Sequence, residues 1–364
     1  MEMNITRCTM NNTNFTQEDC GHKQAVLGPK YHHQVRVYIL VAMIVLSLLG
    51  NIAMCLHIKG KWHHRTAIHV LFLNLAVADI LVTLITMCSQ LVWEFMDREW
   101  IAGEVFCRIF KVFQTFTMVS SNYILLAIAL DRHTVIVYPL FRNTRTKALI
   151  TCAWALSLLP SLPNAYIFQT VTLSDGKAFC VAKFYTSSLS LAHRQVYMAL
   201  ILLVVFIIPI LMVIVLYARI MYTMLTRTGK LTRFHSRKSR LIGSEGAGNA
   251  TQTQTVDTST SQISKAKVKT LKMTLTIVST FLTTCTPYLI QEIIIAFGNP
   301  AILNQNLVAF SGIFSASNSA LNPYIYFLFN SKTPLVKKIA NSTCSCCLPV
   351  PTKSVNETEN TSQV

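Results

Sequence analysis

The chain has 364 residues, of which 52% are hydrophobic and only 13% are charged. A soluble globular domain carries about 25% charged residues, so this composition excludes a soluble protein and indicates an integral membrane protein. A formal net charge of +17 would suggest nucleic-acid binding in a soluble chain. Here the basic residues gather in loops on one side of the apolar segments, so we expect no nucleic-acid partner.

Residues 1–34 form a polar N-terminal segment without the apolar core of a cleaved signal peptide. We expect the first apolar helix to act as the insertion signal instead. Three Asn-x-Thr triplets in this segment match the acceptor pattern for N-glycosylation. They begin at Asn4, Asn11 and Asn14.

Seven apolar runs are long enough to cross the ~30 Å hydrocarbon core of a bilayer as helices. They are residues 35–58, 67–93, 107–139, 148–168, 196–223, 269–297 and 307–329. Because no long soluble segment separates them, we predict an all-α membrane protein in which residues 35–329 form one seven-transmembrane helix bundle.

The charges of the connecting loops predict the orientation. The first, third and fifth connections are basic, whereas the second, fourth and sixth are acidic, mixed or nearly uncharged. By the positive-inside rule the N-terminus lies outside and the C-terminus inside. We therefore expect a multi-pass protein of the plasma membrane with an extracellular N-terminus.

The segments predicted to lie inside the cell are of two kinds. Residues 243–264 are rich in Gly, Ser, Thr and Gln, so we predict a disordered loop over about 228–264, and a disordered tail over 348–364. Residues 330–347 favour a short amphipathic eighth helix on the inner leaflet. Three cysteines lie at its end: Cys344, Cys346 and Cys347. We favour palmitoylation of these cysteines. A metal site is the alternative, and it is less favoured because no histidine or fourth cysteine lies nearby at ligand spacing.

Polar side chains deep inside the apolar runs mark either function or hydrogen-bonded helix packing. The deep ones are Asn51, Asp79, Ser121, Asn318, Ser319 and Asn322. Asp79 has no basic residue at its depth, so it must be protonated, hydrated or paired with a cation. The hydroxyl and amide oxygens suit a small hard cation such as Na⁺, and a purely structural network is the alternative.

A second polar set lies within about two helical turns of the predicted outer surface. It comprises Gln90, Lys111, Gln114, Asn164 and Glu292. Lys111 and Gln114 are three residues apart and therefore share one helix face. With the aromatic residues nearby, this set is typical of an apolar pocket with a few directing groups. Snorkelling of Lys111 to the membrane interface is the alternative.

At the other end of the third apolar run, Asp131 precedes Arg132. An interfacial ion pair worth about 1 kcal/mol is the simpler interpretation. The position of the pair at the end of a buried helix favours a switch.

These features together resemble the rhodopsin-like (class A) G protein-coupled receptors. The motifs that carry the resemblance are Gly50-Asn51, LNLAVAD ending at Asp79, Cys107, DRH at 131–133, Trp154, Pro209 with Tyr217, Phe281 with Pro287, and NPYIY at 322–326. Each motif alone is weak, whereas all of them in order and in separate predicted helices are highly specific.

Within that class the chain is most similar to the vasopressin/oxytocin receptor group and its neuropeptide S and crustacean cardioactive peptide receptor relatives. The segments QLVW, KVFQ and SLLPSLPNAYIF carry this similarity. It implies a peptide ligand held by Gln90, Lys111 and Gln114. Asn164 replaces a glutamine of the group, and Glu292 stands where some relatives have an acid, so we expect the ligand to carry a basic group.

The resemblance also implies how the chain works. It implies a receptor and not an enzyme, with a heterotrimeric G protein as partner and an allosteric Na⁺ at Asp79 in place of any other cofactor. Arrestin and a receptor kinase are implied partners after phosphorylation, and membrane lipid surrounds the bundle. The residues implied in the coupling switch are Asp131, Arg132, Tyr217, Phe281, Pro287 and Tyr326.

The cysteines that we place outside form two groups. The resemblance implies a disulfide between Cys107 and Cys180, which would tether the second outer loop to the third helix. Cys8 and Cys20 are available for another disulfide, and the sequence leaves their pairing open.

Two departures from the family pattern affect the expected mechanism. His133 replaces the commoner tyrosine, which changes little, but Thr284 and Cys285 stand where most members have Cys-Trp. A binding-only or atypically signalling receptor is therefore one alternative. An ion-coupled transporter is the other, although the chain shows no internal repeat. Lys267 leaves helix six without an acid to lock Arg132, so we predict Asp131 as the main partner of Arg132.

Overall fold

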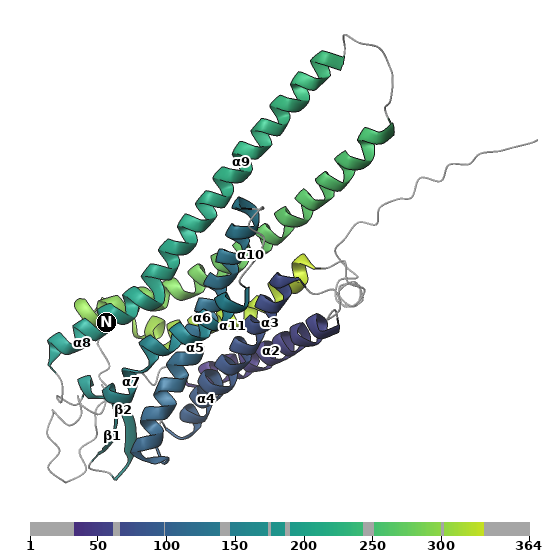
Figure 1. The fold of residues 1–364 in the computed structure, drawn as a ribbon. Coiled ribbons are helices and arrows are strands. Elements are labelled where there is room, and N and C mark those ends of the chain that lie inside the picture. Colours follow the sequence, from purple (N-terminus) through teal and green to yellow (C-terminus); the bar gives the residue numbers. More distant parts are fainter. Residues whose placement is uncertain are drawn as a thin grey trace, which may run out of the picture.

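A computed structural model describes residues 33–60, 66–97, 99–138, 146–173, 176–185, 190–242, 251–299 and 302–330. These residues form a bundle of long helices with one β-hairpin (Figure 1). The predicted glycosylation sites, Cys8 and Cys20, the eighth helix and the three tail cysteines lie outside the described residues.

The described residues form seven long helical segments. In chain order they are α2 (His33–Gly60), α3–η2–α4 (Ala67–Leu81, Val82–Met87, Cys88–Phe95), α5 (Gly103–Val137), α6 (Thr146–Ser161), α8–η4–α9 (Leu191–Ile201, Leu202–Ile207, Ile208–Ile242), α10 (Thr251–Phe297) and α11 (Gln305–Phe329). The elements η2 and η4 are π-helical turns within otherwise continuous helices.

The bundle has the dimensions and surface of a membrane protein. Within the described part of the chain, six helical segments are long and apolar enough to cross a membrane. The remaining one, α11, carries the polar residues Asn318, Ser319 and Asn322 and packs against α10 and α2. Leucines such as Leu49 and Leu56 stand exposed on α2, as a lipid-facing surface requires. The predicted all-α seven-helix bundle is confirmed.

The contact between α2 and α11 depends on a glycine. A Cβ atom added at Gly50 would lie 2.7 Å from Cγ of Pro323, which is closer than real Cβ atoms approach. Glycine at this position therefore allows the Pro323 ring of α11 to pack directly against the backbone of α2. Next to it, the Asn51 amide donates to the backbone carbonyl of Ser319 at 3.1 Å, so the Gly50-Asn51 motif joins two helices far apart in sequence.

A β-hairpin covers one end of the bundle. Strands β1 (Phe168–Thr172) and β2 (Ala178–Ala182) pair antiparallel, with Thr170 opposite Cys180. Cys180 forms a disulfide with Cys107 on α5, with a Cα–Cα distance of 5.7 Å. The implied disulfide is therefore confirmed. We call this the hairpin end of the bundle.

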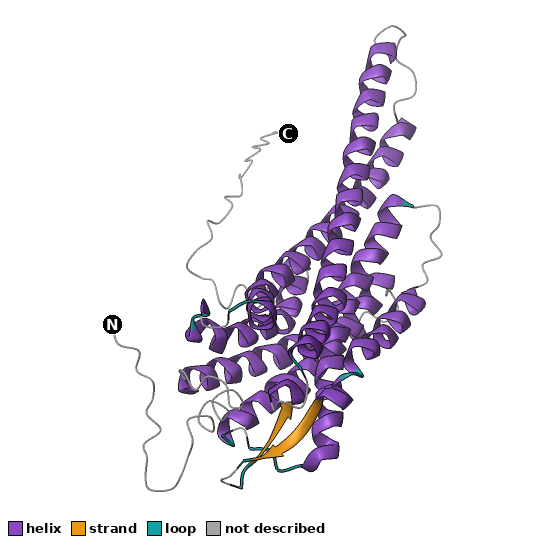
Figure 2. Ribbon diagram, turned by 90° about the vertical axis from the view of Figure 1, so that its left-hand side faces the viewer, coloured by secondary structure: helices purple, strands orange, loops and turns teal. Residues whose placement is uncertain are grey.

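The opposite end carries the extensions of α9 and α10, which run beside each other away from the bundle (Figures 1 and 2). Both helices continue into the predicted disordered loop of 228–264, since α9 ends at Ile242 and α10 begins at Thr251. This corrects the expected loop. Residues 251–264 contain neither proline nor glycine. A helix already formed within the bundle propagates through such residues without a second nucleation cost.

The fourth predicted span, 148–168, also differs in detail. Helix α6 ends at Ser161, a short helix α7 (Asn164–Ile167) follows, and β1 begins at Phe168. Pro163 explains the break, because the residue before a proline is disfavoured in the α conformation. The break brings the chain from the bundle into the hairpin.

Candidate functional site

Polar residues from several helices gather at three levels along α5. The levels are a cavity at the hairpin end, a buried network around Asp79, and an ion pair at the opposite end. The helix therefore connects all three groups that the sequence singles out.

The cavity at the hairpin end has a volume of about 280 Å³. Its walls come from α2, α4, α5 and β2. The lining residues are Arg36, Gln90, Trp93, Glu94, Gln114, Phe179, Cys180 and Val181. Two of the predicted ligand-binding residues, Gln90 and Gln114, are among them.

Lys111 lies one side chain away from this cavity. Its ammonium group donates to Oε1 of Gln114 at 3.0 Å and lies 4.0 Å from the ring centroid of Trp93. The ring of Phe168 follows at 5.2 Å. These contacts direct Lys111 into the bundle instead of outward to the membrane interface, which favours the pocket interpretation over snorkelling.

Asn164 is engaged elsewhere. Its amide nitrogen donates to Oγ1 of Thr115 at 2.8 Å, and its amide oxygen accepts from the Tyr197 hydroxyl at 2.7 Å. The residue is 2% exposed and does not line the cavity. The structure therefore places Asn164 in a network that joins α7, α5 and α8, apart from the other predicted ligand residues.

Glu292 lies on α10, away from the lining of the cavity. Its half-buried carboxylate lies near the Tyr288 hydroxyl and the Arg194 guanidinium. Arg194 also donates to the backbone carbonyl of Ile295 at 3.0 Å, which ties α8 to α10. Glu292 thus belongs to a second wall of the hairpin end.

Two charged residues of the cavity were missed by sequence reasoning. Arg36 on α2 and Glu94 on α4 form an ion pair in which the residues are 4% and 8% exposed. The ring nitrogen Nδ1 of His33 approaches the same carboxylate at 3.1 Å. An arginine near the start of the first apolar run was the available signal, because such a charge requires a partner.

The Asp79 network is fully buried. Ser121 Oγ donates to one carboxylate oxygen of Asp79 at 2.6 Å, and Asn322 Nδ2 donates to the other at 2.8 Å. Ser319 also lies against this carboxylate. The structure thus brings Asp79, Ser121, Ser319 and Asn322 together as the sequence predicts.

In the described part of the chain, helix α11 carries two buried amide oxygens without a hydrogen bond, and one of them belongs to Asn322, which contacts Asp79. The side-chain oxygens of Asn318 and Asn322 are buried and make no hydrogen bond within the described residues. Buried acceptors of this kind are costly unless they find a partner. The Asp79 carboxylate, the Ser121 hydroxyl and the Asn322 amide oxygen are all oxygen donors, the type of ligand that a hard cation prefers.

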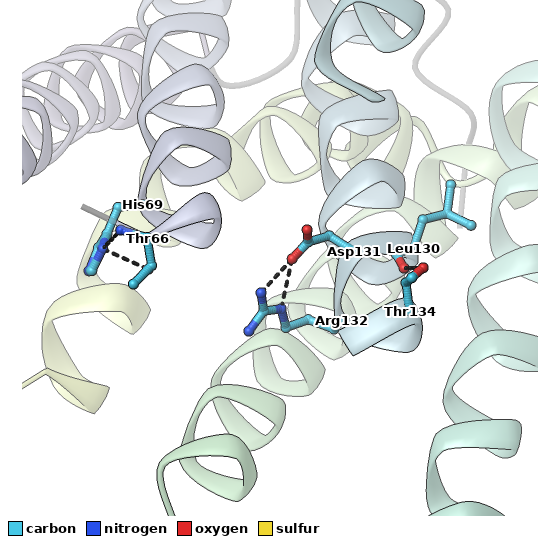
Figure 3. A network of polar contacts seen from close by, with 6 residues as sticks. All are labelled: Thr66, His69, Leu130, Asp131, Arg132 and Thr134. Atoms are coloured by element: carbon cyan, nitrogen blue, oxygen red, sulfur yellow. Dashed lines mark hydrogen bonds and ion pairs between the residues drawn. The ribbon is translucent and has the colours of Figure 1, made fainter. Parts of the chain in front are cut away.

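At the end opposite the hairpin, Asp131 and Arg132 form an ion pair (Figure 3). The Arg132 Nε atom donates to Oδ2 of Asp131 at 3.1 Å, and a terminal guanidinium nitrogen donates to the same oxygen. Asp131 is fully buried. The pairing predicted for Arg132 is therefore present, while its role in a switch stays a prediction.

Two tyrosines implied in the switch lie in the core near this level. Tyr217 on α9 is 6% exposed, with its hydroxyl near Thr274 and Arg132. Tyr326 on α11 is 2% exposed and packs against the ring of Phe72, with ring centroids 5.2 Å apart. Because Thr274 belongs to α10, movement of α10 would alter the surroundings of Tyr217.

Helix α10 has the small polar residues Thr284 and Cys285 at the two positions where the sequence departs from the family pattern. The Thr284 hydroxyl donates to its own helix backbone, to Thr280 O at 3.0 Å. The Cys285 sulfur accepts a hydrogen bond from the Ser315 hydroxyl of α11 at 3.5 Å. Phe281 is buried one turn earlier and Pro287 lies within the helix. The contact between α10 and α11 at this level is therefore polar.

Known proteins share this sequence pattern. The sequence model of the family described as "7 transmembrane receptor (rhodopsin family)" matches residues 50–326. The chain is 30% identical to the gonadotropin-releasing hormone receptor of Octopus vulgaris over 300 residues, which cover 81% of this chain and 70% of that protein.

Two further relatives belong to the groups that the sequence motifs indicated. The chain is 29% identical to the vasopressin V1b receptor of Mus musculus over 327 residues, covering 85% of this chain and 76% of that protein. It is 27% identical to the neuropeptide S receptor of Mus musculus over 303 residues, covering 79% and 75%.

Proposed function

The chain belongs to the rhodopsin family of seven-transmembrane receptors, and we propose that it is a receptor for an extracellular peptide that activates a heterotrimeric G protein. The observation that carries the proposal is the arrangement along α5. A partly polar cavity lies at one end of this helix and the Asp131–Arg132 pair at the other. A ligand and an intracellular partner can therefore act on the same helix.

The orientation proposed from the loop charges agrees with this arrangement. With the N-terminus outside the cell, the disulfide-bonded hairpin faces the extracellular medium, where disulfides persist. The Arg132 end and the extended helices α9 and α10 then face the cytosol. The membrane that we propose for the receptor is the plasma membrane. Arrestin and a receptor kinase are the further partners proposed for that side.

The ligand that we propose is a vasopressin/oxytocin-like peptide or a related neuropeptide. The names of the similar receptors support a peptide. Gln90, Lys111 and Gln114 would meet it at the cavity, and Glu292 would receive a basic group of the peptide at the second wall. A ligand that contacts both walls must reach from α4 and α5 to α10, which favours a peptide over a small amine.

Activation requires that the peptide bind the active arrangement more tightly than the inactive one, because only differential affinity shifts an equilibrium. Pro287 lacks a backbone N–H group and leaves α10 a natural bending point. Outward movement of α10 below that point would uncover Tyr217 and Arg132 for a G protein. The Asp131–Arg132 pair opposes this change, because it keeps the Arg132 guanidinium on Asp131 and away from the G protein.

We propose Asp79, Ser121, Asn318, Ser319 and Asn322 as the residues that would hold an allosteric Na⁺. The ion would supply a positive charge that neutralises the buried Asp79 carboxylate. The orphaned oxygens of Asn318 and Asn322 support this proposal over a purely structural network. In this role the residues keep α3, α5 and α11 together in the inactive arrangement.

The proposal is tested by screening amidated and cyclic neuropeptides against cells that express the chain, with calcium and cyclic AMP as readouts. Untransfected cells and cells expressing an Arg132→Met variant serve as controls. A peptide that gives a response in the wild type alone is expected. Saturable uptake of a solute without any nucleotide exchange would instead identify a transporter.

One observation favours a second candidate, a binding-only receptor of the same fold. Cys285 and Ser315 make a polar contact where most family members have a tryptophan. The chain therefore lacks the tryptophan side chain whose rotation is expected to pass the ligand signal to the inner half of α10. Peptide binding without a second-messenger response in any G protein background would favour this candidate.

A further inference from the structure

The corner of the cavity between α2, α4 and α5 contains three charged groups. Arg36 and Glu94 line the cavity and neutralise each other, and the Lys111 ammonium contacts the lining residues Gln114 and Trp93. We call these three residues the charged corner. None of the proposed roles above uses Arg36 or Glu94.

Counting Arg36, Glu94 and Lys111, and leaving out the His33 imidazole beside Glu94, the charged corner has a formal net charge of +1. In the described part of the chain no carboxylate lies within ion-pair distance of the Lys111 ammonium, because the ion pairs at the hairpin end join other residues. Its neighbours are an amide oxygen and two aromatic rings. Charges in a buried site are screened far less than charges at the surface, so this excess acts on any group that enters.

The pairing of Arg36 decides which ligand charge the corner accepts. If Glu94 were alone, it would balance Lys111 and would also attract a cationic ligand group. With Arg36 bound to it, Glu94 can receive a cation only by giving up a partner inside a buried site, which is strongly unfavourable. An anionic group meets no such obstacle and compensates Lys111.

We infer that the charged corner binds a carboxylate of the peptide ligand, from its C-terminus or from an Asp or Glu side chain, and that Arg36 sets this preference by occupying Glu94. The inference rests on the proposed peptide-receptor function. It assigns the opposite ligand charge to this corner from the one proposed for Glu292. The ligand would therefore carry an acidic group and a basic group at separate positions.

The test uses small probes that share the phenylalanine side chain and differ in the charge of their end groups. N-acetyl-phenylalanine is an anion, N-acetyl-phenylalaninamide is neutral and phenylalaninamide is a cation. Binding to the purified full-length receptor in zwitterionic nanodiscs is measured by ligand-observed NMR titration at physiological salt. We expect the anion to bind about tenfold more tightly than the neutral amide, as for a charge-assisted contact, and the cation most weakly.

Variants then change the charge of the corner in steps. Glu94→Gln raises it to +2 and should increase the ratio of anion to amide affinity. Lys111→Gln and Arg36→Met each lower it to zero and should bring the ratio close to one. The double variant Arg36→Met/Glu94→Gln keeps the net charge at +1 and should retain the wild-type ratio.

The exposed pair Arg108–Glu104 on α5 provides the matched control, because it is also an arginine–glutamate pair near the hairpin end. Glu104→Gln and Arg108→Met should leave the ratio unchanged, which separates the corner from a general attraction of anions to a basic protein. N-acetyl-Asp-Phe-amide, compared with its Asn analogue, distinguishes a side-chain carboxylate from a C-terminal one.

Two results would overturn the inference. The first is equal binding of anion and amide to the wild type. The second is a double variant whose ratio falls to that of Lys111→Gln, since the pair would then act through packing and not through charge. Neither readout depends on a G protein, so a failure of the signalling proposal is distinguishable from a failure at this corner.

Discussion

At the scale of single residues, the fully buried Asp131 carboxylate is the partner of Arg132, the residue proposed to meet the G protein. It accepts both hydrogen bonds that Arg132 is seen to make. The Arg132 side chain is 11% exposed, so it lies at the boundary of the bundle. Loss of the acid would release the guanidinium toward the proposed G protein cleft.

We therefore predict that Asp131→Asn raises basal GTPγS exchange. Removal of an ion-pair contribution of about 1 kcal/mol corresponds to roughly a fivefold shift in a two-state equilibrium. Exchange is measured in membranes without peptide at matched receptor levels. Glu104→Gln, which removes the acid of the exposed pair on the same helix, is the control. Unchanged exchange in Asp131→Asn would contradict the role of this pair.

Asp79 leads to a second prediction at the residue scale. A ligand that binds only the folded state stabilises it by about 1.4 kcal/mol at ten times its dissociation constant. We expect the melting temperature of the purified receptor to be higher in sodium chloride than in N-methylglucamine chloride. Asp79→Asn should abolish that difference. A sodium effect that survives the substitution would place the ion elsewhere.

At the scale of elements, the close approach of α2 and α11 shows how a small residue determines helix packing. A methyl group in place of the Gly50 hydrogen would meet the ring of Pro323, which cannot rotate away like the end of a flexible side chain. Extra atoms forced into a packed contact of this kind cost about 1–3 kcal/mol. The neighbouring Asn51–Ser319 hydrogen bond would be displaced with it.

Gly50→Ala should therefore lower the melting temperature of the receptor. Gly312→Ala on α11 is the matched control, because a Cβ atom there would meet nothing within 4 Å. Alanine has the higher helix propensity, so this variant should be neutral or slightly stabilising. Equal melting temperatures for the two variants would contradict this prediction, because they would show that α2 and α11 can accommodate a methyl group at position 50 without loss of stability.

At the scale of the whole molecule, α5 connects the proposed ligand site with the proposed G protein site. The disulfide fixes its hairpin end, and the Asp131–Arg132 pair lies near its last turn. Coupling between two binding sites is reciprocal. If bound peptide raises the affinity for the G protein by some factor, bound G protein must raise the affinity for the peptide by the same factor.

We predict that GTPγS, which releases the G protein, lowers the affinity of the peptide found by screening by roughly 5- to 150-fold. Radioligand competition in membranes with and without GTPγS measures the shift. An Arg132→Met receptor, which lacks the coupling guanidinium, should show the lower affinity under both conditions. A wild-type affinity insensitive to GTPγS would favour the binding-only receptor.

Much of the fold and part of the candidate site could be predicted from local features. The apolar runs and the depth of Asp79, Lys111 and Arg132 follow from hydropathy along the chain. The extent of α9 and α10 could not be predicted in this way. Composition alone does not reveal that a helix anchored in the bundle continues into a polar segment.

The number of spans, the level of each polar residue and the family motifs can be predicted from the sequence, because they depend on residues close together in the chain. The tertiary structure alone decided which of them meet. Arg36 and Glu94 are 58 positions apart, and Asn164 has its partners on α5 and α8 instead of in the cavity. Such pairings depend on how the helices pack and rotate, which no local pattern records.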